Sequence, residues 1–351
     1  MTELTCFKAY DVRGEIGVNI DEAIAYRIGR AVAQHFSAKS VVIGFDARET
    51  SHSFSAAAAR GVIDAGANVF NIGMAGTEEM YWAVTEFGAC AGIEVTASHN
   101  PINYNGMKFV KSHSRPLDDA ADFQVIKSLA SSQEWVDVAA MGRRFEHAGE
   151  AREAYVNRVL SFVDVKALRP LKIVVNSGNG AAGPTFDAIA KRLQNLGAPL
   201  KFIRVHHTPD ATFPNGIPNP LLPENHSATA EVVKAEKADL GLAFDGDFDA
   251  LISSKLDAPV FTTRLSETVT VHNLNRAFNA LLAELNLKTG ADGRTRTLYS
   301  FRHFYATLNL ERGVTTHALS RQLGNSTEMI DRHYSKYSPL LNAEVHSGRK
   351  S

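Results

Sequence analysis

The chain has 351 residues, 44% hydrophobic and 21% charged, so it is long enough for two or three domains that each bury a core. Its net charge of −1 indicates no particular partner, and its two cysteines, Cys6 and Cys90, exclude a disulfide scaffold and favour a reducing cytoplasm. The first residues lack the layout of a signal peptide, and no apolar run approaches the roughly 20 residues of a membrane-spanning helix, so we expect no membrane association.

Short apolar runs alternate with helix-sized segments through the first 250 residues. In chain order, the pattern predicts a strand at 40–48, a helix at 53–66, a strand at 68–73, a helix at 78–88 and a strand at 92–98. A polar stretch at 131–150 is predicted to join domains. The rhythm then restarts with a strand at 171–178, a helix at 184–197, a strand at 200–207, a helix at 228–238 and a strand at 239–247. This alternation predicts two layered α/β domains with mainly parallel sheets.

The character of the sequence changes after about residue 256. Residues 1–256 hold 25 Lys and Arg against 30 Asp and Glu, a net charge of −5, whereas residues 257–351 hold 12 against 8, a net charge of +4, with five histidines. Apolar residues in this tail recur at helical spacing, so we expect an all-helical segment, and its charge predicts weak binding to an anionic partner such as DNA. We therefore expect three parts, 1–150, 151–256 and 257–351.

Two motifs carry the chemistry of the first 250 residues. VTASHNP places Ser98 just after an apolar run, at the strand end where open α/β sheets bind ligands, although a loop closed by ordinary Asn-Pro turn chemistry would read the same. DGDFD places Asp245, Asp247 and Asp249 after the run LGLAF, where alternating carboxylates offer hard oxygen ligands for Mg²⁺. The glycine and the glutamate that an EF-hand loop requires after its aspartates are absent, so an EF-hand is excluded. A serine and a metal loop together suit phosphoryl transfer.

At this point the sequence resembles the first two domains of the α-D-phosphohexomutases, the phosphomannomutase/phosphoglucomutase family. The matching blocks, besides DGDFD, are FKAYDVRG (7–14), GTEEMY (76–81), TASHNP (96–101), YNGMKFV (104–110), VVNSGNGAAGP (174–184) and FPNGIPNPLLPEN (213–225). The resemblance implies that Ser98 carries a phosphoryl group between the enzyme and hexose phosphates or a hexose bisphosphate. It also implies that Asp245, Asp247 and Asp249, with an oxygen of the phosphorylated Ser98, hold Mg²⁺.

The same resemblance implies roles for three further residues. Arg13 is expected to steady charge on the transferring group, because a guanidinium is a rigid fork of donors. Lys108 is expected to move the proton of the sugar hydroxyl, and His99 to contact the phosphoserine loop. The sequence departs from the family where Ala250 replaces the arginine of the metal loop. The family's sugar-recognition and phosphate-gripping third and fourth domains have no counterpart in residues 250–351, so we expect impaired mutase turnover.

The tail resembles the C-terminal catalytic segment of tyrosine recombinases, or phage integrases. RTLYSFRHFYATLNLERG and LSRQLGNSTEMIDRHYSKY carry the match, which implies that Arg302 and His303 lie at a phosphate-binding position and that Tyr334 is the nucleophile. Tyr299 and Asn325 stand where many members of that family carry histidine. The family's first catalytic arginine and its lysine would lie upstream of residue 257, where the mutase-like sequence stands, so we expect no recombination.

The leading hypothesis is therefore a phosphohexomutase that interconverts 1- and 6-phosphohexoses of mannose or glucose through a phosphoserine. One alternative is a DNA-binding or recombination protein of the tyrosine recombinase type. Another is a non-functional fusion product of a genome rearrangement.

Overall fold

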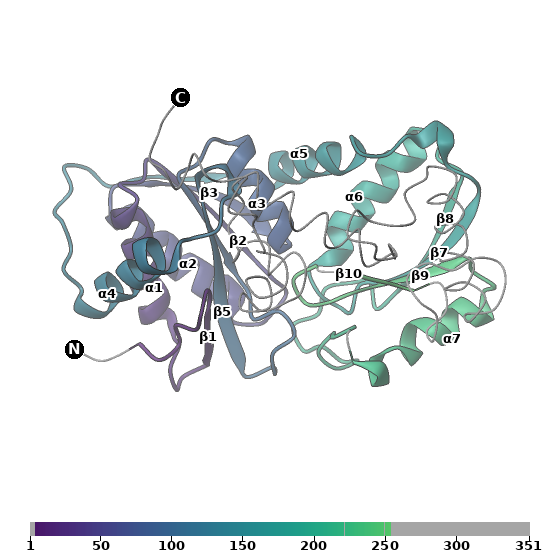
Figure 1. Cartoon of the computed structure of the whole chain (residues 1–351), viewed down its shortest axis with the longest axis horizontal. Helices are drawn as coiled ribbons and strands as arrows, with labels where there is room; N and C mark the ends of the chain where they lie inside the picture. The colour runs from purple at the N-terminus through teal and green to yellow at the C-terminus, as the bar shows by residue number, and fades with distance from the viewer. Residues whose placement is uncertain (1–3, 221, 249, 254–351) are drawn as a thin grey trace, which may run out of the picture. The chain divides into compact units, whose positions relative to one another are not determined.

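The first α/β domain, called the first layer below, is built on a six-stranded sheet in the order β1-β5-β4-β2-β3-β6 (Figure 1). The computed structural model describes residues 4–220, 222–248 and 250–253, and all of them lie within the unit formed by residues 1–260. The strands are β1 (Val12–Glu15), β2 (Ser40–Phe45), β3 (Asn68–Met74), β4 (Ala91–Val95), β5 (Tyr104–Lys111) and β6 (Arg144–Glu146). Strands β4, β2, β3 and β6 run parallel, whereas β1 and β5 are antiparallel to their neighbours.

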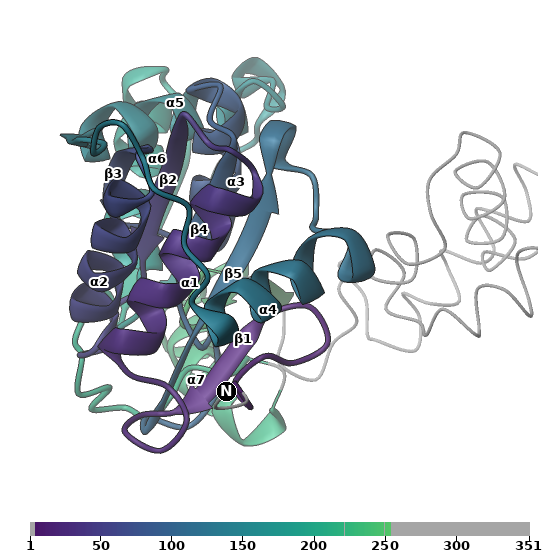
Figure 2. The same cartoon turned by 90° about the vertical axis from the view of Figure 1, so that its left-hand side faces the viewer.

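Helices cover both faces of this sheet, which explains why its central strands are mostly apolar. One face carries α1 (Glu22–His35), α2 (Ser51–Asp64) and α4 (Gln124–Ser132), and the other carries α3 (Thr77–Glu86) and α5 (Ala148–Leu160). Figure 2 looks onto the face covered by α1 and α2. Successive side chains of β2 point to opposite faces of the sheet, as they do along any strand. Val41 and Ile43 pack with α1 and α2, whereas Val42 packs with α3.

The second layer is a four-stranded sheet in the order β10-β9-β7-β8. Its strands are β7 (Leu171–Asn176), β8 (Leu200–Val205), β9 (Leu240–Phe244) and β10 (Ala250–Ser253), and its helices are α6 (Ala182–Asn195) and α7 (Ser227–Ala235). Strands β8, β7 and β9 are parallel, and β10 pairs antiparallel with β9. Ile173 and Val175 pack against Phe186 of α6, whereas Asn176 of the same strand bonds to Thr229 of α7. Helices therefore cover both faces of this sheet as well.

Two α/β layers with mainly parallel sheets are as the sequence predicted, and every strand and helix predicted in residues 40–98 and 171–247 is present with shifted ends. The prediction omitted β1, β5, β6, β10, α1, α4 and α5. The helix α1 begins at a signal that sequence reasoning passed over, since Asp21 Oδ1 accepts a hydrogen bond of 2.8 Å from Ile24 N. The interpretation of residues 131–150 as a joint was wrong in part, because β6 and the start of α5 belong to the first layer.

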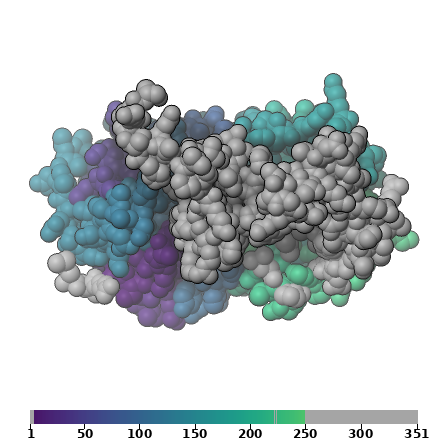
Figure 3. Space-filling model, viewed as in Figure 1, coloured from purple at the N-terminus to yellow at the C-terminus, as the bar shows by residue number. Residues whose placement is uncertain are grey.

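Short helical turns complete the described residues, at Ser112–Ser114, Asp119–Phe123, Val165–Ala167 and Pro223–Asn225. None of the helices in the described part of the chain has both the length and the apolarity needed to span a membrane. Figure 3 draws the described residues in their chain colours and the others in grey. The predicted helices after residue 256, together with Asp249, Arg302, His303 and Tyr334, lie outside the described residues.

Candidate active site

The loop after β4 holds Ser98 in an unusual backbone conformation. Ser98 has a φ of +51° and is 4% exposed. The left-handed region costs a non-glycine residue on the order of 1–3 kcal/mol, so such a conformation persists only where the surrounding contacts enforce it. Asn100 closes the loop, because its backbone N and its Nδ2 both donate to Ala97 O, at 2.9 and 2.8 Å. The loop is therefore tightly specified around one serine.

The side chain of Ser98 reaches the loop that follows β9 in the second layer. Ser98 Oγ donates a hydrogen bond of 2.7 Å to Asp245 Oδ2. His99 lies beside both, with its Nδ1 3.2 Å from Ser98 Oγ and 3.6 Å from Asp245 Oδ2. The structure thus brings together the serine and the first aspartate that the two sequence motifs singled out. Both lie at carboxyl ends of parallel strands, the edge where α/β sheets bind ligands.

Asp247 is held by side chains of the first layer. Its Oδ2 lies 2.5 Å from Lys108 Nζ of β5 and accepts a hydrogen bond of 2.6 Å from Thr77 Oγ1 at the start of α3. Its backbone oxygen accepts from Thr77 N at 3.1 Å. Asp247 is fully buried, and among the described residues its Oδ1 has no hydrogen-bond partner. An unpartnered buried carboxylate oxygen is costly unless another group satisfies it.

The two aspartates differ in how they hold a proton. Burial raises the pKa of Asp245, repulsion from Asp247 raises it further, and hydrogen bonds from His99 and Ser98 only partly oppose this. Burial would also raise the pKa of Asp247, but attraction to Lys108 and hydrogen bonds from Lys108 and Thr77 outweigh it and lower the pKa to about 2. Asp247 is therefore the firmly ionised member of the pair.

The donor set of this loop fits a hard divalent cation. Asp245 and Asp247 are buried carboxylates two residues apart, and the open Oδ1 of Asp247 is an oxygen that a cation would satisfy. Within the described residues no group of three His, Cys, Asp or Glu side chains gathers as a metal site. The third predicted ligand, Asp249, lies outside them.

Arg13 lies on β1, the edge strand that pairs with β5, and Lys108 lies on β5, which pairs antiparallel with β4. In β1, Arg13 Nε donates to Asp11 Oδ2 at 2.8 Å, and the Arg13 side chain is 27% exposed. Lys108 forms an ion pair with Asp247, which lies in the second layer. Of the predicted site residues within the described part of the chain, Ser98, His99, Lys108 and the two aspartates are thus joined by direct contacts, whereas Arg13 pairs with Asp11.

Sequence reasoning missed two buried residues beside Ser98. Asp46 and Arg48 follow β2, are 1% and 5% exposed, and lie next to the serine loop because β2 neighbours β4 in the sheet. Burial raises the pKa of Asp46, although the positive charge of Arg48 opposes the shift. The signal was present in FDARET, where polar residues follow an apolar strand, but it was interpreted only as a strand end.

A third missed residue, Glu94, is a buried acid in the middle of β4. It is fully buried between Gly44 of β2 and Lys108 of β5, its partners in strand register. Neither carboxyl oxygen has a hydrogen-bond partner among the described residues. Burial, followed by repulsion from Asp46 and other acids, raises its pKa well above the ordinary 4.5, although Lys108 attracts the charged form. Glu94 therefore stays protonated over a pH range in which an exposed glutamate is ionised.

This raised pKa predicts a pH-dependent gain in stability for Glu94→Gln. Above pH 4.5 the unfolded chain releases the proton that folded Glu94 keeps, so wild-type stability falls as the pH rises towards the folded pKa, by at most about 1.4 kcal/mol per pH unit. Glutamine has no proton to release, so the variant should match the wild type near pH 4.5 and exceed it increasingly at higher pH. Urea unfolding from pH 5 to 8 measures the difference, with exposed Glu86→Gln as the control. Parallel profiles for wild type and Glu94→Gln would contradict the assignment.

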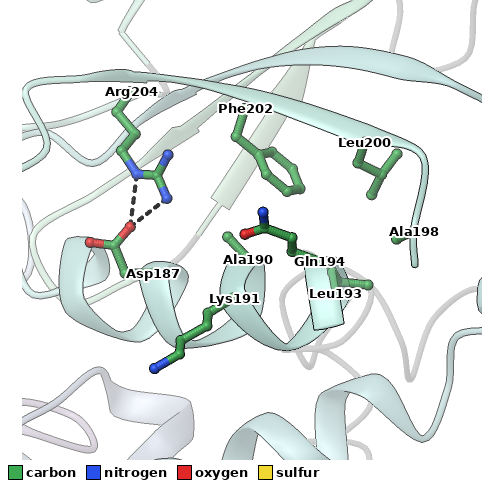
Figure 4. Close-up of a pocket in the computed structure, with 9 residues that line it drawn as sticks. All are labelled: Asp187, Ala190, Lys191, Leu193, Gln194, Ala198, Leu200, Phe202 and Arg204. Carbon is green, nitrogen blue, oxygen red and sulfur yellow. Dashed lines mark hydrogen bonds and ion pairs between the residues drawn. The ribbon is translucent and has the colours of Figure 1, made fainter. Parts of the chain in front are cut away.

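A Ser–His–Asp arrangement also occurs in the second layer, but it is not a catalytic triad. Ser177 Oγ lies 3.2 Å from His207 Nδ1, and His207 Nε2 lies 2.9 Å from Asp187 Oδ2. Ser177 has no exposed surface, so its hydroxyl is closed to substrate in this structure, whereas Ser98 retains 4% exposure. Asp187 also pairs with Arg204 at 2.7 Å, at one end of a cavity of about 390 Å³ between α6 and β8 (Figure 4). None of the residues that line this cavity belongs to the site around Ser98.

Family models identify the class of protein that this fold and site define. "Phosphoglucomutase/phosphomannomutase, alpha/beta/alpha domain I" matches residues 5–135, and domain II of the same family matches residues 153–255. Through these two domains the chain belongs to the phosphoglucomutase/phosphomannomutase family.

Individual relatives agree with this assignment. The chain is 51% identical over 249 residues to a phosphomannomutase of Salmonella montevideo, which covers 71% of this chain and 55% of the relative. It is 45% identical over 248 residues to a protein of Xanthomonas campestris named "Phosphohexose mutases", covering 70% and 53%. A crystal structure of a phosphoglucomutase/phosphomannomutase family protein from Burkholderia thailandensis aligns with a TM-score of 0.63 at 30% identity, covering 73% of this chain and 56% of that one. The chain thus spans about half the length of the curated relatives it matches.

Proposed function

We propose that this protein takes up a phosphoryl group on Ser98 and exchanges it with the hydroxyl groups of hexose phosphates, as a phosphohexomutase of mannose or glucose phosphates. The observation that carries the proposal is the hydrogen bond of 2.7 Å between Ser98 Oγ and Asp245 Oδ2, which joins the serine loop of the first layer to the acidic loop of the second. Membership of the phosphoglucomutase/phosphomannomutase family supports the same chemistry.

The proposed transfer needs a cation, because a phosphoserine placed beside Asp245 and Asp247 would meet their negative charge. Mg²⁺ held by Asp245, Asp247 and Asp249, with a phosphoserine oxygen, would neutralise that charge and polarise the phosphoryl group. The buried carboxylates and the unpartnered Oδ1 of Asp247 support this assignment for the two described aspartates.

The remaining site residues have proposed roles in proton and charge handling. As the phosphorus–oxygen bond to Ser98 breaks and a bond to the sugar oxygen forms, the sugar hydroxyl must lose its proton. We assign that proton transfer to Lys108, which would accept the proton as a neutral amine and whose Nζ lies beside the acidic loop. His99 would contact the phosphoserine, because its Nδ1 lies 3.2 Å from Ser98 Oγ. Arg13 would turn from Asp11 towards the phosphoryl group when substrate is present.

The experiment that tests this function is an intact-mass measurement of the full chain after incubation with glucose 1,6-bisphosphate and Mg²⁺. The wild type should gain one phosphoryl group, Ser98→Ala should gain none, and Ser53→Ala, which removes a hydroxyl from α2, should behave as the wild type. Chelation of Mg²⁺ should slow the gain, and added Mg²⁺ should restore it. A wild-type chain that never gains phosphate would remove the proposal, and so would an equal gain by Ser98→Ala.

For residues 257–351 we propose descent from the C-terminal segment of a tyrosine recombinase, with Arg302, His303 and Tyr334 as remnants of its site. The sequence match and the net charge of +4 support this proposal. We expect weak DNA binding that falls steeply with salt, because lysine and arginine displace counterions from the phosphate backbone. If no DNA is retained even at low ionic strength, the tail has no DNA-binding role. We also propose a cytoplasmic location, which the two free cysteines, Cys6 and Cys90, support.

A further inference from the structure

The conformation of Ser98 is imposed by contacts on both sides of its backbone. On one side, Ser98 N donates a hydrogen bond of 2.8 Å to Thr96 Oγ1. On the other side, Ser98 O accepts a hydrogen bond of 2.8 Å from Arg48 Nη2. Both contacts are buried. A serine whose N–H and C=O are both fixed cannot leave the left-handed region without breaking a buried hydrogen bond.

Arg48 binds several backbone oxygens of the loop besides that of Ser98. Its two terminal nitrogens donate to four backbone oxygens at 2.6 to 3.0 Å: those of Ser98, Asn100, Pro101 and Tyr104. A guanidinium suits this task, because its planar fork presents several donors in a fixed geometry, which an ammonium group does not. Arg48 itself forms an ion pair with Asp46.

Thr96 and Arg48, which hold the two sides of the Ser98 backbone, both contact the carboxylate of Asp46. Asp46 Oδ2 accepts a hydrogen bond of 2.7 Å from Thr96 Oγ1 and lies 3.6 Å from Arg48 Nε. Asp46 Oδ1 accepts from Ser51 Oγ at 2.5 Å and from Arg48 N at 3.0 Å, which fixes the carboxylate on the turn after β2. The hydroxyl of Thr96 donates a hydrogen bond to Asp46. The lone pairs of Thr96 Oγ1 are therefore oriented to accept a hydrogen bond from Ser98 N.

We propose that Asp46, Thr96 and Arg48 act as a clamp that sets the direction of Ser98 Oγ towards the second layer. None of the three is assigned to the reacting atoms, so they are positioning residues. The role of the clamp in phosphoryl transfer rests on the proposed function, whereas its hold on the Ser98 backbone does not. We expect loss of the clamp to slow phosphoryl transfer to Ser98 more than it weakens binding of the sugar bisphosphate. A misdirected nucleophile lowers the rate of the transfer step, whereas the contacts that bind the sugar are unchanged.

A pair of threonine variants tests the clamp. Thr96→Val keeps the shape of the side chain but removes the hydroxyl, whereas Thr96→Ser keeps the hydroxyl. Amide hydrogen exchange of the full chain should show the Ser98 N–H exchanging at least about tenfold faster in Thr96→Val and at the wild-type rate in Thr96→Ser. The amides of β3 provide the reference for intact folding. Unchanged exchange in Thr96→Val would overturn the clamp, whether or not the protein takes up phosphate.

The same variants report on transfer. In single-turnover reactions with glucose 1,6-bisphosphate, phosphate gain on Ser98 should slow by about 10- to 100-fold in Thr96→Val, at a nearly unchanged half-saturating concentration, and Thr96→Ser should recover the rate. Arg48→Lys, which keeps the charge but loses the fork, should also be slow. Faster exchange with an undiminished transfer rate would overturn the positioning role. If the wild type takes up no phosphate, the proposed function fails, and the exchange measurement alone decides the clamp.

Discussion

Glu79→Ala is expected to lower the free energy of unfolding by about 2–3 kcal/mol. Glu79 lies in the first turn of α3 and is fully buried. Its Oε2 accepts a hydrogen bond of 2.6 Å from Thr185 Oγ1 of α6, and its Oε1 accepts one of 3.2 Å from Arg152 Nε of α5. One carboxylate therefore connects a helix of the first layer with a helix of the second.

The size of this effect follows from what the substitution leaves behind. Thr185 is fully buried, so its hydroxyl would lose its partner without gaining water. Arg152 keeps a hydrogen bond of 2.5 Å to Met74 O, and its side chain is 24% exposed, so its charge can be partly solvated. For that reason we expect less than the 3–5 kcal/mol that follows when a fully buried charge loses its partner.

Urea unfolding of the full chain measures this loss, and the neighbouring Glu78→Ala is its matched control. Glu78 is exposed on the same helical turn, so its replacement should change stability by no more than about 0.5 kcal/mol. Equal stabilities for Glu79→Ala and Glu78→Ala would show that the buried carboxylate does not connect the layers as described.

Gly246→Ala is expected to slow phosphate gain on Ser98 by about 100-fold while leaving the two sheets folded. A Cβ atom at position 246 would lie 2.7 Å from Ser98 O, closer than non-bonded atoms approach. The obstacle is backbone and cannot rotate away, so the acidic loop would have to withdraw from the serine loop. That withdrawal would break the hydrogen bond between Ser98 and Asp245, on which the proposed phosphoryl transfer depends.

The matched control is Gly149→Ala, because a Cβ atom there would meet no atom within 4 Å. Neither glycine has a positive φ, so alanine introduces no backbone strain at either position and the comparison isolates the close contact. Intact-mass time courses with glucose 1,6-bisphosphate, with circular dichroism as the check on folding, measure the effect. If Gly246→Ala takes up phosphate at the rate of Gly149→Ala, the two loops do not meet as the structure has them.

The sequence by itself predicted the alternating strands and helices of both layers, because side-chain periodicity is a local property that a few turns of chain reveal. It also placed Ser98 and the acidic loop at strand ends, since polar residues directly follow buried apolar runs. It failed where the signal was weaker. The short edge strand β6 has three exposed residues, and α1 was missed although Asp21 caps it.

Only the tertiary structure decided which strand ends meet. Ser98 and Asp245 are 147 positions apart, and Thr185 and Glu79 are 106 apart, so their contacts depend on how the two layers pack. In the sequence, Asp46 and Arg48 look like ordinary polar residues that follow a strand. They can hold the serine loop only because the sheet order places β2 beside β4. Local periodicity fixes elements, whereas a site built from several loops is fixed by strand order and layer contact, which no short stretch of sequence contains.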